Sequence, residues 1–136
     1  MWEMTKMNKD KFIARLKKLS YPKLAKRAWK VWSLKRRKES ADYRGYVTCI
    51  TCDAVHPYQE MELGHFCHGK LSFNKQATQI QCTRCNHYLS GNLGKYADWL
   101  NKTYGQGTSE RLHKLAGKEK DRPYSKDELI SIILGE

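Results

Sequence analysis

Two Cys-x-x-Cys pairs constrain the fold of this chain more than any other feature of its sequence. Cys49 and Cys52 form the first pair, and Cys82 and Cys85 form the second after 29 intervening residues. Together they supply the four thiolates of a closed, tetrahedral zinc site. Such a site is structural, because no coordination position stays open for water. Zinc (Zn²⁺) is the ion that we expect, with an iron–sulfur cluster as the alternative.

The cysteines also indicate the compartment. Four of the five belong to these pairs, and Cys67 is left over. Paired cysteines of this kind are typical of metal ligands in a reducing cytosol. The sequence has no apolar run of about eighteen residues, which a membrane span would need, and Met1–Asp10 lacks the apolar core of a secretory signal. We therefore expect a cytoplasmic protein without a membrane partner.

Positive charge is concentrated near the N-terminus. The formal net charge is +12, and residues 1–40 contain 14 Lys and Arg with only 3 Asp and Glu, whereas residues 41–136 contain 12 and 11. Each Lys or Arg that neutralises a phosphate releases counterions, so this concentration is typical of a protein that binds a polyanion. Nucleic acid is the expected partner, with a solvated basic face or an anionic membrane surface as alternatives.

The same 40 residues have the periodicity of two basic helices. Apolar residues recur at helical spacing from Lys9 to Leu19 and again from Pro22 to Ser40. We therefore predict a basic helical extension over residues 1–40 and a zinc-stapled domain over residues 41–136. The candidate DNA contacts of the extension are Lys26, Arg27, Lys35, Arg36, Arg37 and Lys38.

The remainder of the chain predicts an α+β fold. Gly45–Thr48 is strand-like, and the second cysteine pair opens a helix that carries Asn86 and His87. Ser125 and Glu128 have the spacing of a capping box ahead of a C-terminal helix. We expect further helices over residues 93–104 and 108–116, a turn over residues 53–58 and a loop over residues 64–69.

Two segments beside the cysteine pairs are not needed by a plain zinc site. Gly64-His65-Phe66 lies between the pairs, and Asn86 and then Tyr88-Leu89-Ser90-Gly91-Asn92 follow the last cysteine. In these segments the sequence resembles the phage NinG (Rap) recombination nucleases, which are a branch of the HNH, or ββα-metal, endonucleases. The resemblance also includes Gly45-Tyr46-Val47, Gln81 before the third cysteine, Tyr96 and Tyr104-Gly105, and it covers residues 41–134.

The resemblance implies a small ββα-metal core, HNH-like and treble-clef-like, stapled by the four-cysteine zinc site and flanked by the basic N-terminal helices and by C-terminal helices. It puts His65 on the general-base position and Asn86 on a ligand position for a catalytic Mg²⁺ or Mn²⁺. A neutral imidazole accepts a proton from water near pH 7, and a hard cation neutralises phosphate charge. The implied reaction is hydrolysis of DNA phosphodiesters.

One position departs from the HNH pattern beside the histidine. Many HNH enzymes have an acidic metal ligand directly before the catalytic histidine, where this chain has Gly64. The second ligand of the catalytic ion is therefore open. The candidates are Glu62, His68, His87 and Asn92, and the shared Ser-Gly-Asn text favours Asn92. Asn86 and each of these candidates also have a structural interpretation. Asn86 can cap the following helix, and Asn92 can end a turn.

A second departure concerns the asparagine that braces the loop of the general base in this family. The resemblance predicts it five residues before the third cysteine, where this chain has Ala77, and Asn74 lies three residues earlier. Asn74 either replaces the brace, or backbone contacts hold the loop alone.

The expected function is therefore a metal-dependent DNA endonuclease. By the resemblance, its substrates are branched recombination intermediates such as Holliday junctions and D-loops, in the host bacterial cytoplasm. The alternative is a non-catalytic zinc module that binds DNA and recruits recombination proteins. An RNA-binding zinc protein fits charge and zinc but leaves the Gly-His-Phe and Cys-Asn text unexplained. Because two opposed strands need two nicks, a homodimer is a further expectation.

Overall fold

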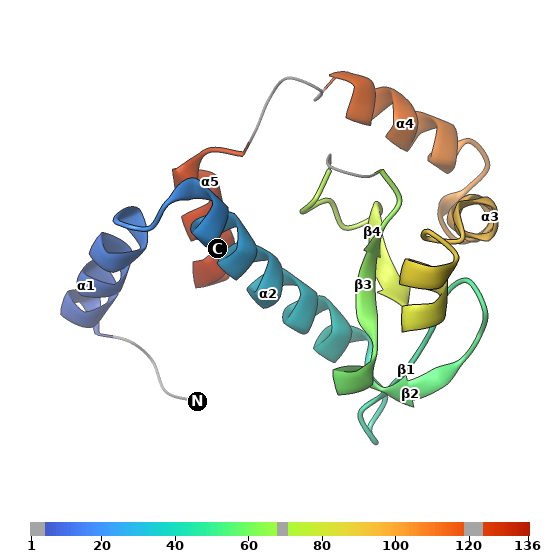
Figure 1. The fold of residues 1–136 in the computed structure, drawn as a ribbon, viewed down its shortest axis with the longest axis horizontal. Coiled ribbons are helices and arrows are strands. Elements are labelled where there is room, and N and C mark those ends of the chain that lie inside the picture. The colour runs from blue at the N-terminus through green and yellow to red at the C-terminus, as the bar shows by residue number, and fades with distance from the viewer. Residues whose placement is uncertain (1–4, 68–70, 119–123) are drawn as a thin grey trace. The chain divides into compact units, whose positions relative to one another are not determined.

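The computed structural model describes residues 5–67, 71–118 and 124–136. They form two compact units, Met1–Trp32 with Tyr124–Glu136, and Ser33–Pro123. Helix α2 (Tyr21–Ser40) contributes to both units (Figure 1). The predicted division into residues 1–40 and 41–136 stays a prediction. Within the described ranges, no helix combines the length and the apolar character needed to cross a membrane.

The first unit joins the two ends of the chain. Helix α1 (Lys6–Lys17) begins where the Thr5 hydroxyl accepts the N–H of Asn8, and helix α5 (Lys126–Leu134) begins with the predicted capping box. The two helices contact each other, and the Lys126 ammonium donates to the carbonyls of Lys17 and Leu19 at the end of α1. Leucines from both helices are fully or almost fully buried, as in the case of Leu16.

The second unit contains two antiparallel sheets of two strands each. Strand β1 (Tyr46–Thr48) pairs with β2 (Val55–Pro57), and the first cysteine pair lies in the turn between them. The expected turn over residues 53–58 therefore contains a strand. Both Val55 and His56 are exposed, so β2 lacks the apolar alternation by which a half-buried strand is recognised.

The second sheet leads into the second cysteine pair. After the short 3₁₀ helix η1 (Tyr58–Glu60), strand β3 (Glu62–His65) pairs with β4 (Thr78–Gln81), so that Gly64 lies opposite Gln79 and His65 opposite Thr78. Cys82 follows β4 directly, and the π-helical turn η2 (Arg84–Tyr88) follows Cys82. Gly64 and His65 are thus strand residues, whereas the sequence predicts a loop that begins at Gly64.

Helices α3 (Leu93–Tyr104) and α4 (Thr108–Lys118) complete the second unit and agree with the predicted helices. Their apolar faces enclose a core with the segment that follows β3. The buried residues of this core are Phe66, Cys67, Leu71, Ala77, Tyr96, Leu100, Leu112 and Ala116. The α+β class is therefore confirmed.

Candidate functional site

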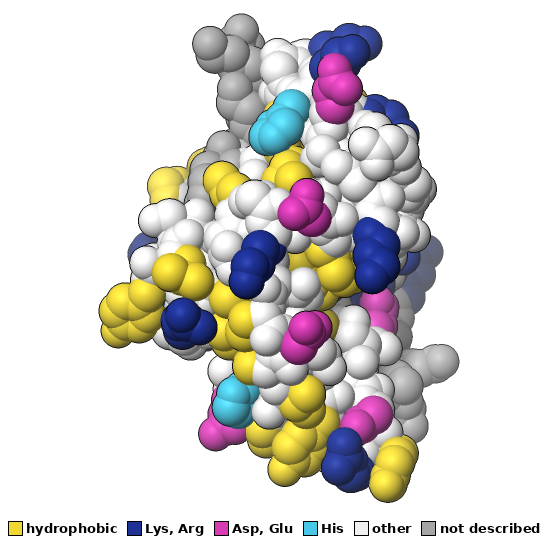
Figure 2. Space-filling view, turned by 90° about the vertical axis from the view of Figure 1, so that its right-hand side faces the viewer, with side chains coloured by type: hydrophobic (Ala, Val, Ile, Leu, Met, Phe, Trp, Pro, Cys, Tyr) yellow, Lys and Arg dark blue, Asp and Glu magenta, His cyan; other side chains and the backbone are white. Residues whose placement is uncertain are grey.

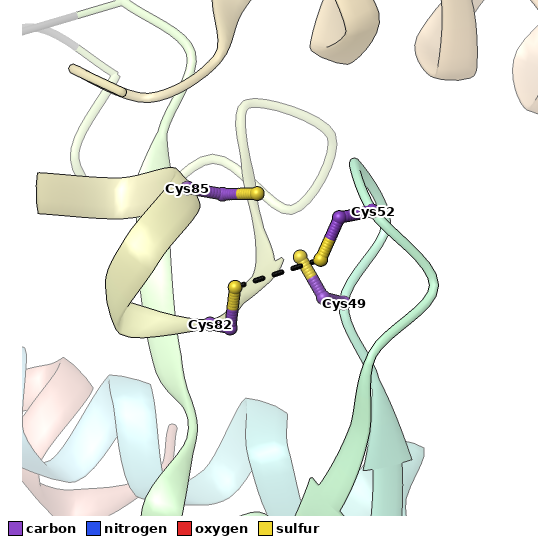
Figure 3. A group of neighbouring side chains, drawn as sticks. All are labelled: Cys49, Cys52, Cys82 and Cys85. Atoms are coloured by element: carbon purple, nitrogen blue, oxygen red, sulfur yellow. Dashed lines mark hydrogen bonds between the residues drawn. The ribbon is translucent and has the colours of Figure 1, made fainter. Parts of the chain in front are cut away.

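The four cysteines of the two pairs form one cluster of thiols. Cys49 and Cys52 come from the β1–β2 turn, Cys82 and Cys85 come from the end of β4 and from η2, and all four side chains point toward one centre (Figure 3). Their sulfur atoms lie within 4.8 Å of one another, and the Sγ atoms of Cys52 and Cys82 are 3.6 Å apart. Thiolates about 2.3 Å from a tetrahedral zinc are separated by roughly 3.8 Å, so the thiol cluster can hold a metal ion such as zinc.

The thiols of this cluster do not ionise equally. Burial opposes ionisation of Cys49, but hydrogen bonds from the Thr51 side chain and from backbone N–H groups outweigh it and lower its pKa to about 7. Burial raises the pKa of Cys52 to about 12 and also raises the pKa of Cys82. Thiolates this close repel one another, so a divalent cation is what allows all four to lose their protons.

Two polar side chains contact these sulfur atoms from outside the ligand set. The Thr51 hydroxyl is 3.3 Å from Cys49 Sγ, and Asn92 Nδ2 donates to Cys85 Sγ over 3.7 Å. Asn92 has a left-handed backbone, with φ of 47°, at the start of α3. The structure therefore brings Asn92 to a sulfur atom of the thiol cluster, and its predicted part in a catalytic cation site stays a prediction.

Three side chains of the segment that follows the third cysteine contact the carboxylate of Glu62. Its carboxylate accepts from the Thr83 hydroxyl over 2.6 Å and from Asn86 Nδ2 over 2.8 Å, and it lies 2.7 Å from His87 Nε2. Partial burial opposes ionisation, but these hydrogen bonds and the charge of His87 hold the pKa of Glu62 below its ordinary value. Among the predicted cation ligands, the structure thus brings together Glu62, Asn86 and His87.

Gly64 permits a close approach of two side chains to β3. A Cβ atom at this position would lie 1.9 Å from Gln81 Oε1 and 3.0 Å from Asn86 Oδ1. The backbone carbonyl of Gly64 accepts from the hydroxyl of the fully buried Tyr96 over 2.9 Å. Burial raises the pKa of this phenol, which therefore stays protonated and donates. No side chain fits at position 64 unless Gln81 moves.

His65 is the last residue of β3, directly after this close approach. Because side chains alternate along a strand, Glu62 and Gly64 share one face of β3 and His65 belongs to the other. The side chain is partly exposed, while its Nε2 atom is shielded from solvent. The structure thus puts an imidazole one residue from Gly64 and separates it from the Glu62 carboxylate.

Asn74 braces the chain that faces His65. Its Oδ1 accepts the N–H groups of Gln76 and Ala77 over 2.9 and 3.0 Å, and the Ala77 carbonyl accepts the N–H of Phe66. The Asn74 side chain therefore fixes this loop, and a backbone hydrogen bond ties the loop to the residue after His65; that Asn74 replaces the brace of the family stays a prediction. His68, another predicted cation ligand, lies outside the described residues.

The residues predicted to contact DNA differ in their exposure and in their hydrogen bonds. Lys26, Arg27, Lys35 and Lys38 are exposed. Arg36 donates to the Lys75 carbonyl and the Thr78 hydroxyl, and Arg37 donates to the carbonyls of Ser33, Tyr58 and Met61. These two guanidinium groups hold neighbouring segments of the second unit, and their predicted phosphate contacts stay predictions.

A groove of about 530 Å³ beside β1 and β4 contains two residues, Arg44 and Trp99, that the sequence patterns do not single out. Its lining includes Arg36 and Arg44 with the aromatic rings of Tyr46, Trp99 and Tyr104. The guanidinium of Arg44 lies 4.9 Å from the centre of the Tyr46 ring. Figure 2 shows one face of the molecule, on which cationic and acidic side chains are interspersed with hydrophobic ones and do not form one basic patch.

Sequence comparison identifies the family of this chain. The model of the NinG family, described as the bacteriophage lambda NinG protein, matches residues 3–135. The chain therefore belongs to the NinG family. Membership of this family implies a phage recombination-related protein. No curated protein and no solved structure matches it.

Proposed function

We propose that this member of the NinG family is a metal-dependent DNA endonuclease of the HNH type. The observation that carries the proposal is that an amide oxygen and an imidazole lie at two adjacent positions of β3. The amide oxygen of Asn86 lies against Gly64, and the imidazole of His65 follows at the end of β3. An oxygen donor for a hard cation and a base that titrates near neutral pH are the two groups that metal-assisted hydrolysis requires.

The zinc and the catalytic cation have separate places in this proposal. Four thiolates fill the coordination sphere of zinc, so the thiol cluster has no position for water or substrate. Its role is to hold the end of β4 and η2 against the β1–β2 turn. This fixes Asn86, which directly follows Cys85 in η2.

Glu62 orients Asn86 for its role. A carboxylate only accepts hydrogen bonds, so the amide nitrogen of Asn86 must face Glu62 and the amide oxygen must face Gly64. Amide oxygens are ligands that Mg²⁺ and Mn²⁺ accept. When bound there, such a cation supplies the positive charge that stabilises the charge developing on the scissile phosphate. His65 accepts the proton of the attacking water.

The expected grip on DNA comes from the exposed cations. The side chains of Lys26, Arg27, Lys35 and Lys38 are exposed and can contact phosphates, which position a protein on DNA without reading its sequence. The groove with Arg44, Tyr46 and Trp99 combines cations with aromatic rings, as surfaces for unstacked bases do. A preference for Holliday junctions and D-loops follows from the resemblance to recombination nucleases, as does a homodimer that nicks both strands.

One observation favours the alternative of a non-catalytic DNA-binding zinc module. Among the residues that the structure describes, the four thiols are the only group of three or more His, Cys, Asp or Glu side chains that can hold a metal ion. The catalytic cation would therefore depend on amide oxygens, on Glu62 with His87, or on the DNA itself. The two functions differ in whether His65 is needed for a chemical step.

The test incubates zinc-loaded protein with a labelled four-way junction and a matching linear duplex, in Mg²⁺, Mn²⁺ or EDTA. We expect nicks that need the divalent cation and that fall at least about a hundredfold in His65→Ala, the lower end of what a general base contributes. His56→Ala, which removes an exposed histidine of β2, is the matched control and should cut normally. If all three proteins bind the junction and none cuts with either cation, the DNA-binding module is the correct function.

A further inference from the structure

Two amide side chains turn their oxygen atoms toward the same point above Gly64. The position that a Cβ atom would take at Gly64 lies 1.9 Å from Gln81 Oε1 and 3.0 Å from Asn86 Oδ1. We call these two atoms the oxygen cluster. Both are acceptors, and neither can donate a proton to the other.

Hydrogen bonds to strict acceptors fix both orientations. Gln81 Nε2 donates to the Gly91 carbonyl over 2.7 Å and to the Thr51 hydroxyl over 3.1 Å. Since a carbonyl cannot donate, the nitrogen of Gln81 must face Gly91 and its oxygen must face Gly64. The Glu62 carboxylate fixes Asn86 in the same way. Neither amide can rotate its oxygen away without breaking a hydrogen bond.

The oxygen of Gln81 lacks the partner that buried polar atoms ordinarily have. The side chain is 0% exposed, and Oε1 accepts no hydrogen bond from the described part of the chain. Most buried polar atoms in proteins are paired with a donor, an ordered water or an ion, so this atom needs a positive partner. A second acceptor that faces the same point favours a cation, because hard cations bind several oxygen ligands.

We propose that Gln81 and Asn86 are ligands of one hard divalent cation, so that Gln81 replaces the acidic residue that many HNH enzymes have where this chain has Gly64. The inference rests on the proposed function, which puts a cation at Asn86. It also explains the glycine, because a side chain at position 64 would take the space that Gln81 Oε1 occupies. Neutral oxygens select Mg²⁺ or Mn²⁺, whereas the softer zinc prefers the thiols.

The proposal predicts how the cation depends on DNA. Two uncharged amide oxygens bind Mg²⁺ weakly, and Mg²⁺ sites in proteins commonly complete their coordination with water and with substrate phosphates. The cation should therefore bind weakly to the free protein and more tightly in the complex with DNA. Glu62 adds negative charge from outside the oxygen cluster through its hydrogen bond to Asn86.

The experiment measures Mn²⁺ binding to zinc-loaded protein by electron paramagnetic resonance, without DNA and with an uncut junction analogue. Gln81→Met removes the oxygen at similar length, and we expect it to raise the Mn²⁺ dissociation constant at least about tenfold. Gln81→Glu keeps an oxygen and adds a charge, so it should lower this constant. Gln79→Met makes the same change two residues earlier on β4, where the amide donates to Tyr104, and should leave Mn²⁺ binding unchanged.

The outcomes separate this proposal from the proposed function. If Asn86→Ala loses Mn²⁺ and Gln81→Met does not, the cation site stands, Gln81 is not a ligand, and a water satisfies its oxygen. If neither change alters Mn²⁺ binding, the oxygen cluster is not a cation site and the role of Gln81 fails, whereas the nuclease proposal is decided by the cutting assay with His65→Ala. Should Gln81→Met not fold, as judged by zinc content and circular dichroism, Gln81→Glu decides the question, because unchanged Mn²⁺ affinity in that variant overturns the role of Gln81.

Discussion

The thiol cluster and the oxygen cluster are built from the same stretch of chain, yet they are held in opposite ways. Cys82 and Cys85 can hold a metal ion with their own side chains, and the two cysteines of each pair lie three positions apart in the sequence. Gln81 and Asn86 are the immediate neighbours of these cysteines. Their side-chain oxygens face the same point only because β3 places Gly64, which has no side chain, beside them. The thiol cluster thus depends on local spacing and the oxygen cluster on tertiary packing. Changes in the thiol cluster should therefore have the largest effect on the stability of the fold. Changes in the oxygen cluster should alter cation binding without unfolding the protein.

Loss of the thiol cluster should have the largest effect. We expect Cys82→Ser, or treatment with a strong chelator, to abolish the cooperative thermal transition of the second unit, because the binding energy of a structural zinc is folding energy. Circular dichroism with zinc analysis measures this. Cys67→Ala, at a buried cysteine outside the cluster, is the control and should cost only about 1 kcal/mol. Equal losses in the two variants would show that the cluster is not a metal staple.

Closing the space at Gly64 should have the next largest effect. Gly64→Ala puts a Cβ atom against Gln81 Oε1, and we expect a loss of about 1–3 kcal/mol in the free energy of unfolding, with zinc retained. Gly94→Ala is the matched control, because no atom lies within 4 Å of its added Cβ in α3, and it should gain up to about 1 kcal/mol. Urea denaturation distinguishes them. Equal stability of the two variants would mean that the close approach at Gly64 does not constrain the fold.

A substitution at Asn92 tests whether the Ser-Gly-Asn segment supports the thiol cluster or the oxygen cluster. Asn92→Gly removes the donor to Cys85 without straining the left-handed backbone, and we expect zinc affinity to fall about 10–100-fold in competition with a chelating dye. Ser90→Gly, at another residue of positive φ, is the control and should retain full affinity. Unchanged zinc affinity with weakened Mn²⁺ binding would instead assign Asn92 to the catalytic cation.

The smallest expected effect is the acid sensitivity of the Glu62 contacts. The pKa of Glu62 is lower in the folded protein than its unfolded value of about 4.3, so its contribution to stability is fully present above that pH. The contribution disappears as the pH falls through the folded pKa. Glu62→Gln should therefore be less stable than the natural chain at pH 6 and begin to approach it at pH 4, as measured by urea denaturation of samples whose zinc content is unchanged. Glu110→Gln, an exposed carboxylate of α4, should differ little from the natural chain at either pH.

Local patterns in the sequence identify the thiol cluster, the helices and the capping box, since each depends on residues a few positions apart. The contacts of Glu62 with Thr83 and Asn86 span 21 and 24 residues, and no local spacing predicts them. Gln81 precedes a predicted zinc ligand, but its close approach to Gly64 depends on the pairing of β3 with β4. A basic run likewise does not reveal that Arg37 reaches backbone carbonyls while Lys38 stays exposed.

The composition of the first unit determines the order in which parts of this chain can fold. Helix α1 needs α5 to cover its apolar face, and the hydroxyl of Tyr21 donates to the carbonyl of Tyr124 more than one hundred positions later. The core and the thiol cluster of the second unit contain no residue from 124–136, so they can form before those residues are in place. The apolar face of α1, in contrast, stays uncovered until α5 packs against it. The unit that contains the earliest residues of this sequence therefore depends on the latest ones.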